Sequence, residues 1–142
     1  MWNRWVLVAA CILGGSAVAM GAFQAHGLDN MLEGLGVEQV EAAKRIENCG
    51  TAVRYQLAHA LAIFATGVLS VASRRKILAP QLLMMLGVCC FSGGLYEIVF
   101  RGEATHWAIV PLGGLSLISG WTALAVASVL AVAHMERTGS TG

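Results

Sequence analysis

The apolar residues of this chain gather in four long runs, and most polar residues lie between them. The runs cover approximately residues 5–25, 55–73, 77–100 and 107–135. An α-helix needs about 20 mainly apolar residues to cross the hydrocarbon core of a bilayer. We therefore predict an all-α fold, an integral membrane bundle of four transmembrane helices that forms one domain over residues 1–142. The last run exceeds one span, so we expect its helix to tilt or to extend past the membrane.

The first run also has the form of a cleavable signal peptide. Arg4 precedes it, and the small residues Ala17 and Ala19 resemble a cleavage site. However, the run stays uncharged beyond Ala19 as far as Asp29, and three further apolar runs follow. We therefore expect an uncleaved first span.

The main polar stretch lies between the first two runs, over residues 28–54. Residues 29–36 are broken by glycine and are predicted to form a loop. From Val37 onward the apolar residues recur at helical spacing, which predicts an amphipathic helix between the first two spans. This helix is expected either to lie at the membrane interface, to pack on the end of the bundle, or to lead straight into the second span. Its apolar face is predicted to consist of Val37, Val40, Ala43, Ile46 and Val53.

The composition indicates that hydrocarbon surrounds most of these side chains. Hydrophobic residues make up 57% of the chain and charged residues 12%, whereas an ordinary soluble domain is about 25% charged. A soluble protein of this size could not cover its core with so few charges. The net charge of +1 gives no argument for nucleic acid binding, so we expect the lipid bilayer as the main partner.

The cysteines show neither the spacing of a zinc site nor a disulfide framework. The sequence contains no C-x-x-C, and three of its four cysteines lie in apolar runs, so we interpret them as small buried hydrophobic residues. The sequence also lacks a phosphate loop and a nucleophile paired with a base. We therefore expect no metal, no cofactor and no enzymatic activity. The four cysteines are Cys11, Cys49, Cys89 and Cys90.

The basic residues predict the orientation of the bundle. Arg74, Arg75 and Lys76 form a cluster in the short segment between the second and third runs. Short loops rich in lysine and arginine stay in the cytoplasm. Arg4 and Arg137 lie on the same predicted side as this cluster. We therefore predict that both termini are cytoplasmic.

Six polar side chains within or beside the runs are candidates for a buried polar cluster. A polar side chain in a span normally faces the bundle and finds a partner there. The cluster could lock one helix against another, or it could form a proton relay or a ligand site. Two histidines can also ligate a metal or a haem, although nothing in their spacing selects this use. The six residues are His26, Tyr55, Gln56, His59, Ser92 and Tyr96.

Small residues and helix ends complete the prediction. Glycines allow helices in a membrane to approach closely. Glu97 is spaced to pair with Arg101 within one helix, and Pro111 is expected in the first turn of the last helix rather than at a kink. The glycines predicted to pack between helices are Gly14, Gly15, Gly21, Gly93, Gly94, Gly113, Gly114 and Gly120.

Several of these segments together resemble a known family. The matching segments are residues 21–28 (GAFQAHGL), 51–62, 91–96 (FSGGLY) and 111–121. They are similar to the small membrane family called domain of unknown function 423, which includes transmembrane protein 256 and the bacterial YgdD-like proteins. The chain departs from the family pattern at Gln24, where a glycine is usual, and at Val110, where a threonine is common. The resemblance implies a four-span protein of the plasma or inner membrane with no established activity.

These observations lead to one main hypothesis and two alternatives. The main hypothesis is a structural or interaction component of the membrane, as a homo-oligomer or with a membrane protein partner. The first alternative is a small oligomeric transporter or channel with a polar site around His26, Tyr55, Gln56 and His59. The second is a membrane enzyme or haem carrier that uses His26 and His59.

Overall fold

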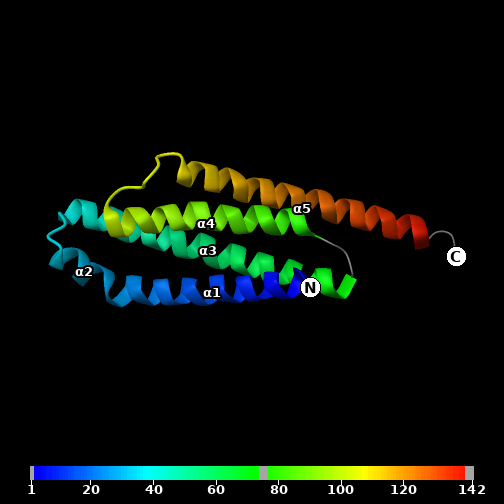
Figure 1. The fold of residues 1–142 in the computed structure, drawn as a ribbon, viewed down its shortest axis with the longest axis horizontal. Coiled ribbons are helices and arrows are strands. Elements are labelled where there is room, and N and C mark those ends of the chain that lie inside the picture. The colour runs from blue at the N-terminus through cyan, green and yellow to red at the C-terminus, as the bar shows by residue number, and fades with distance from the viewer. Residues whose placement is uncertain (1, 74–76, 140–142) are drawn as a thin grey trace.

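The computed structural model describes residues 2–73 and 77–139, and its helices run almost the whole length of these two segments (Figure 1). Four of the five helices are long and apolar enough to cross a membrane. This confirms the predicted all-α architecture with four candidate spans. The helices are α1 (Trp2–His26), α2 (Leu28–Gly34), α3 (Gln39–Ser73), α4 (Leu78–Arg101) and α5 (Ile109–Gly139).

The four long helices form an open row rather than a closed bundle. Helix α3 packs against both α1 and α4, and α5 packs against α4. Helices α1 and α5 therefore form the two edges of the row. Successive long helices run antiparallel (Figure 1). Only 11% of the most apolar window of α5 is buried. Most of the α5 surface is therefore available to lipid or to another helix.

The buried side chains form two separate apolar clusters. One joins Leu28 and Leu32 of α2 to Cys49 of α3 and Val99 of α4. The other lies toward the opposite end of the bundle along the helix axes, where Val6 and Ala10 meet Ile63 and Met84. The polar residues described below lie between these clusters.

Glycines set the close approach of α4 and α5. A Cβ atom added to Gly113 would collide with the backbone of Phe91 and lie 2.8 Å from the carbonyl carbon of Cys90. A Cβ at Gly120 would lie 2.8 Å from the side chain of Met84, and one at Gly94 would lie 2.8 Å from Val110. Close packing without β-carbons is typical of helix pairs in membranes.

The other predicted packing glycines divide into two groups. Gly14 and Gly21 face Ala60 and Val53 across the α1–α3 contact, and Gly114 lies at ordinary contact distance from Phe91. The prediction is wrong for Gly15 and Gly93, because an added Cβ would meet nothing within 4 Å at either position. Small size alone did not distinguish a glycine at a helix contact from one on an open face.

The predicted loop at residues 29–36 is also wrong in part. Residues Leu28–Gly34 form α2, with Leu28 and Leu32 fully buried one helical turn apart. Burial of these two leucines stabilises a short helix whose flanking glycines, Gly34 and Gly36, indicated a loop. The helix ends at Gly34, and the chain turns at Gly36, whose φ of +68° lies in the left-handed region that suits glycine.

The predicted amphipathic segment leads straight into the second span as one continuous helix, α3. Its buried face is shifted from the predicted one, because Val40 is 62% exposed and Ala43 is also exposed. Ala42, Cys49 and Ala52 are buried instead. Cross-helix contacts with α2 and α4 thus select a different stripe of this helix.

Other local predictions can be compared directly. Arg101 donates to Glu97 at 3.1 Å, which confirms the predicted pair. Pro111 lies in the first turn of α5, as predicted. Cys11 and Cys89 are exposed on the bundle surface, so their predicted burial is wrong, and only Cys49 is fully buried. The basic cluster at residues 74–76 lies outside the described residues.

Candidate functional site

The carboxamide of Gln56 is the centre of a polar cluster that joins three helices. Gln56 lies on α3 and is 5% exposed. Its Nε2 donates to the carbonyl oxygen of Leu13 at 2.8 Å and to Ser16 Oγ at 2.7 Å, both on α1. The hydroxyl of Tyr96 on α4 donates to Gln56 Oε1 at 2.8 Å. One side chain therefore holds α1 and α4 to α3.

Two serine hydroxyls complete this cluster. Ser16 donates to the carbonyl oxygen of Leu13 at 3.1 Å. Ser92 on α4 is buried and donates to the carbonyl oxygen of Ala52 on α3 at 3.0 Å. Each hydroxyl carries one hydrogen and two lone pairs, and the amide nitrogen carries two hydrogens. Every side-chain donor of the cluster is thus used internally, whereas acceptor capacity remains on its oxygens.

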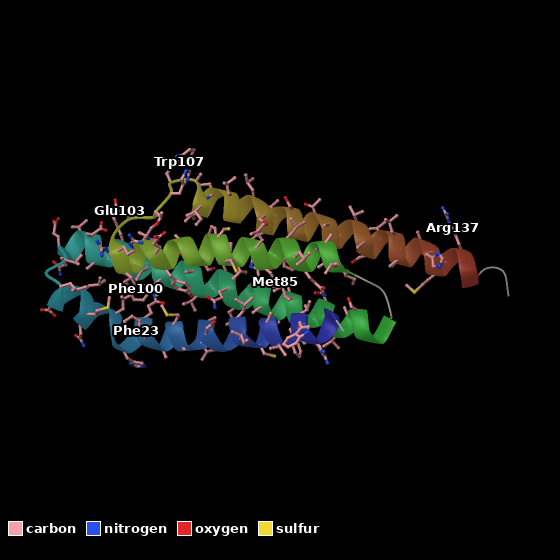
Figure 2. The ribbon with its side chains drawn as sticks, viewed as in Figure 1. Phe23, Met85, Phe100, Glu103, Trp107 and Arg137 are labelled. Carbon is pink, nitrogen blue, oxygen red and sulfur yellow. The ribbon has the colours of Figure 1, made fainter. Side chains whose placement is uncertain are left out.

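A groove between α1 and α4 runs over this cluster, with Gln56 of α3 at its floor. Its volume is about 320 Å³, and it opens sideways on the bundle surface. The stacked rings of Phe23 and Phe100, 6.1 Å apart, lie near the C-terminal ends of α1 and α4 (Figure 2). The groove is lined by Leu13, Ser16, Met20, Gln56, Val88, Cys89, Ser92, Gly93 and Tyr96.

His59 forms a second polar contact, on a different side of α3. Its Nδ1 lies 2.7 Å from the carbonyl oxygen of Tyr55, and the indole Nε1 of Trp121 donates to its Nε2 at 3.1 Å. A carbonyl oxygen only accepts and an indole N–H only donates. These two partners therefore assign the hydrogen of a neutral imidazole to Nδ1. The contact ties α3 to α5.

Tyr55 lies beside this histidine rather than in the Gln56 cluster. Its ring centroid is 6.0 Å from that of His59 and 4.6 Å from that of Phe91. Tyr55 is 45% exposed on the bundle surface. The predicted set is thus divided between two sites, with Gln56, Ser92 and Tyr96 in one and Tyr55 with His59 in the other.

His26 belongs to neither site, so its predicted place in a buried cluster is wrong. It is exposed at the end of α1. In the antiparallel contact of α1 with α3, Gly14 faces Ala60 and Gly21 faces Val53. This register places His59 level with residue 15, so His26 lies about 16 Å further along the helix axis. The two histidines cannot share one metal or haem in this arrangement.

Two residues of the sites escaped the sequence prediction. Ser16 was missed because a serine in a helix can bond to its own backbone, so its sequence position gives no sign of a partner. Trp121 offered a stronger signal, since an indole N–H inside an apolar span needs an acceptor. Among the described residues, no group of three or more His, Cys, Asp or Glu side chains is arranged to hold a metal ion.

Further hydrogen bonds join α1 to α3, α5 to α4, and α4 to the loop that follows it. Gln24 of α1 donates to the carbonyl oxygen of Ile46 on α3 at 3.0 Å. Ser116 of α5 donates to the carbonyl oxygen of Leu83 on α4 at 2.8 Å. In the last turns of α4, the carboxylate of Glu97 accepts from the backbone N–H of Thr105 in the following loop at 2.9 Å. Interhelical hydrogen bonds therefore connect all four long helices.

Comparison with known proteins identifies the family of this chain. The family described as "Protein of unknown function (DUF423)" matches residues 20–114. A UPF0382 membrane protein of Haemophilus influenzae is 30% identical over 128 residues, which cover 90% of this chain and 95% of that protein. The UPF0382 inner membrane protein YgdD of Escherichia coli K12 is 32% identical over 134 residues, which cover 91% of this chain and 92% of YgdD. No solved structure matches the chain.

The matched segment contains Gln56, His59, Ser92 and Tyr96, whereas Ser16 and Trp121 lie outside it. The relatives are named as membrane proteins, one of them of the inner membrane. Four helices of this chain are long and apolar enough to cross a bilayer. The chain is therefore a multi-pass protein of the inner or plasma membrane, and it belongs to the family of unknown function DUF423.

Proposed function

We propose that this chain is a structural or interaction component of the membrane, in which buried polar side chains fix the helices relative to one another. The observation that carries the proposal is that these polar side chains form hydrogen bonds between helices. Gln56 links α1, α3 and α4, and the contact of His59 with Trp121 links α3 to α5. A polar group in hydrocarbon is costly unless it finds a partner inside the protein. In this arrangement the polar residues of the spans stabilise the packing of the helices.

The edges of the row supply the surface for interaction. Helix α5 contacts α4 along one side, and its opposite side carries large apolar residues such as Leu115, Ile118 and Val129, all exposed on the bundle surface. In a bilayer this side would meet lipid, a second copy of the chain or another membrane protein. A fixed bundle with a free edge helix suits a component that assembles laterally.

We further propose that both termini face the cytoplasm. The N-terminus of α1, the C-terminus of α3, the N-terminus of α4 and the C-terminus of α5 lie at the same end of the bundle (Figure 1). Arg4 of α1 and Arg137 of α5 lie at that end. In the sequence, the basic cluster at residues 74–76 falls between the last residue of α3 and the first residue of α4. A short basic loop is retained in the cytoplasm.

The proposal is tested by asking whether the polar residues support stability or transport. The purified chain would be reconstituted in liposomes, and the flux of protons, common ions and small neutral solutes would be compared with protein-free liposomes. The thermal midpoint of Gln56→Leu would be measured in parallel, with Leu61→Ala as a control at an exposed position of the same helix.

We expect flux at the level of empty liposomes and a lower thermal midpoint for Gln56→Leu than for the control. The opposite pattern would overturn the proposal. That pattern is a flux well above background which Gln56→Leu abolishes without changing the thermal midpoint.

A further inference from the structure

We infer that the groove between α1 and α4 binds a neutral lipid with a free hydroxyl group, whose chain lies in the groove and whose hydroxyl donates to the oxygens of the Gln56 cluster. The inference is independent of the proposed role in assembly. It rests on the place of the groove in the bundle, on its size, and on the hydrogen-bonding capacity of its floor.

The groove faces hydrocarbon rather than water. Leu13, Ser16 and Met20 lie in the central part of α1, and the lining residues of α4 extend from Val88 to Tyr96, in the middle and second half of that helix. Apolar side chains pack on either side of it, around Leu28 and Val99 at one end and around Val6 and Met84 at the other. A lipid chain could therefore enter sideways from the bilayer.

The size of the groove suits part of one lipid chain. Its volume of about 320 Å³ corresponds to roughly ten water molecules at their share of liquid volume. A transmembrane helix is about 10 Å across, which is too wide to enter a space of that volume. The α4 wall is open at Gly93, where an added Cβ would meet nothing within 4 Å. A larger side chain at this position would project into the groove.

The floor of the groove selects for a hydrogen-bond donor. The two N–H groups of Gln56 and the hydroxyls of Ser16, Ser92 and Tyr96 all donate to partners within the bundle. Their oxygens retain lone pairs, because a hydroxyl oxygen accepts two hydrogen bonds and an amide oxygen also accepts two. A ligand that only accepts, such as an ester or ether, finds no N–H or O–H donor here, and only the weak S–H donor of Cys89.

The absence of charged side chains from the groove lining further restricts the classes of ligand that could bind. The nine lining residues include no Asp, Glu, Lys, Arg or His. An ammonium group would be a donor, but no carboxylate lies in the lining to pair with it, and an unpaired charge in hydrocarbon is costly. A carboxylate or phosphate would oppose the lone pairs of the floor. A neutral hydroxyl satisfies both conditions.

The test uses the full chain in detergent micelles and tritiated 1-hexadecanol as the probe. Unlabelled hexadecanol, its methyl ether and hexadecanoate would compete for binding. The methyl ether keeps the chain and the oxygen but loses the donor. Because one hydrogen bond contributes about as much as a tenfold change in affinity, we expect the ether to compete roughly tenfold more weakly than the alcohol. Hexadecanoate should compete no better than the ether.

A matched pair of variants locates the binding. Gly93→Leu should fill the groove and abolish saturable binding. Gly15→Leu introduces the same side chain at another glycine with open space, outside the groove lining, and should leave binding unchanged. Equal competition by alcohol and ether would identify the groove as a site for any alkyl chain and overturn the inference.

Two other results would also contradict it. Binding that survives Gly93→Leu would place the lipid elsewhere. Efficient disulfide cross-linking of two chains through Gly93→Cys, in a background without the native cysteines, would place a second copy over the groove. The competition series uses the unmodified chain, so the inference stays testable even if Gly93→Leu fails to fold.

Discussion

The hydroxyl of Tyr96 donates to the carboxamide oxygen of Gln56 at 2.8 Å, and this bond joins α4 to α3 at the point where Gln56 also reaches α1. Tyr96 and Gln56 are 40 residues apart in the chain. Neither side chain could find this partner within its own helix. The contact therefore depends on the packing of the helices and in turn stabilises it.

The contact of His59 with Trp121 should hold the imidazole in one neutral form. Because the indole N–H can only donate, Nε2 of His59 must carry a free lone pair, and the hydrogen resides on Nδ1. We predict that ¹⁵N NMR of the chain at neutral pH shows the Nδ1–H tautomer for His59. An Nε2–H tautomer or a doubly protonated ring would contradict the hydrogen bond.

Trp121→Phe tests the stability that this contact contributes. The change removes the donor and keeps an aromatic ring against His59. We expect the free energy of unfolding to fall by about 1 kcal/mol, the usual size of a hydrogen bond between membrane helices. Trp107→Phe is the control, since Trp107 is 83% exposed before the start of α5 (Figure 2), and it should change the unfolding free energy little.

Gly113 should tolerate substitution far less well than Gly93. An alanine at Gly113 would press against the backbone of Phe91 and Cys90, and backbone atoms cannot move aside as a side chain can. We expect Gly113→Ala to destabilise the fold by about 1–3 kcal/mol, as is typical of overpacking. Gly93→Ala adds the same methyl group to open space and should be neutral or stabilising, because alanine favours helix.

Thermal unfolding of both glycine variants in the same detergent provides the measurement. Equal midpoints for Gly113→Ala and Gly93→Ala would show that α4 and α5 do not approach as closely as described. The comparison is direct because both positions lie inside helices and both changes add one carbon.

The proposed orientation is tested by reporter fusions. A reporter that is active only outside the cytoplasm, fused after Gly142, should be inactive, and the same reporter inserted at Gly36 should be active. The reason is the basic cluster at residues 74–76, which the positive-inside rule retains in the cytoplasm. Two further candidate spans follow this cluster, so the C-terminus is expected on the same side of the membrane. The reverse pattern of activity would invert the topology and leave the fold unchanged.

The sequence was sufficient to predict the four long helices, because runs of apolar residues of this length have few other structures available to them. It was insufficient for α2, where Gly34 and Gly36 indicated a loop. The helix there depends on the burial of Leu28 and Leu32 by other helices, a tertiary contact that no local pattern reveals.

The candidate site was predictable in its residue types and not in its pairings. Gln56 and Tyr96 stood out because polar side chains are rare inside spans. Which of them meet depends on the register between helices, and this register separates His26 from His59 by several turns of α1. Ser16 gave no signal at all, because its hydroxyl could have been satisfied within its own helix.

The most direct test of the central claim, that buried polar side chains fix these helices together, is a double-mutant cycle of Gln56→Leu and Tyr96→Phe. The free energy of unfolding would be measured in bicelles for the unmodified chain, both single variants and the double variant. Gln56→Leu alone leaves the hydroxyl of Tyr96 without its acceptor, so we expect it to cost about 1–2 kcal/mol. Tyr96→Phe should then cost less in the Gln56→Leu background than in the unmodified chain, with a favourable coupling of about 0.6–1.7 kcal/mol. A coupling of zero, with the single effects simply adding, would contradict the account.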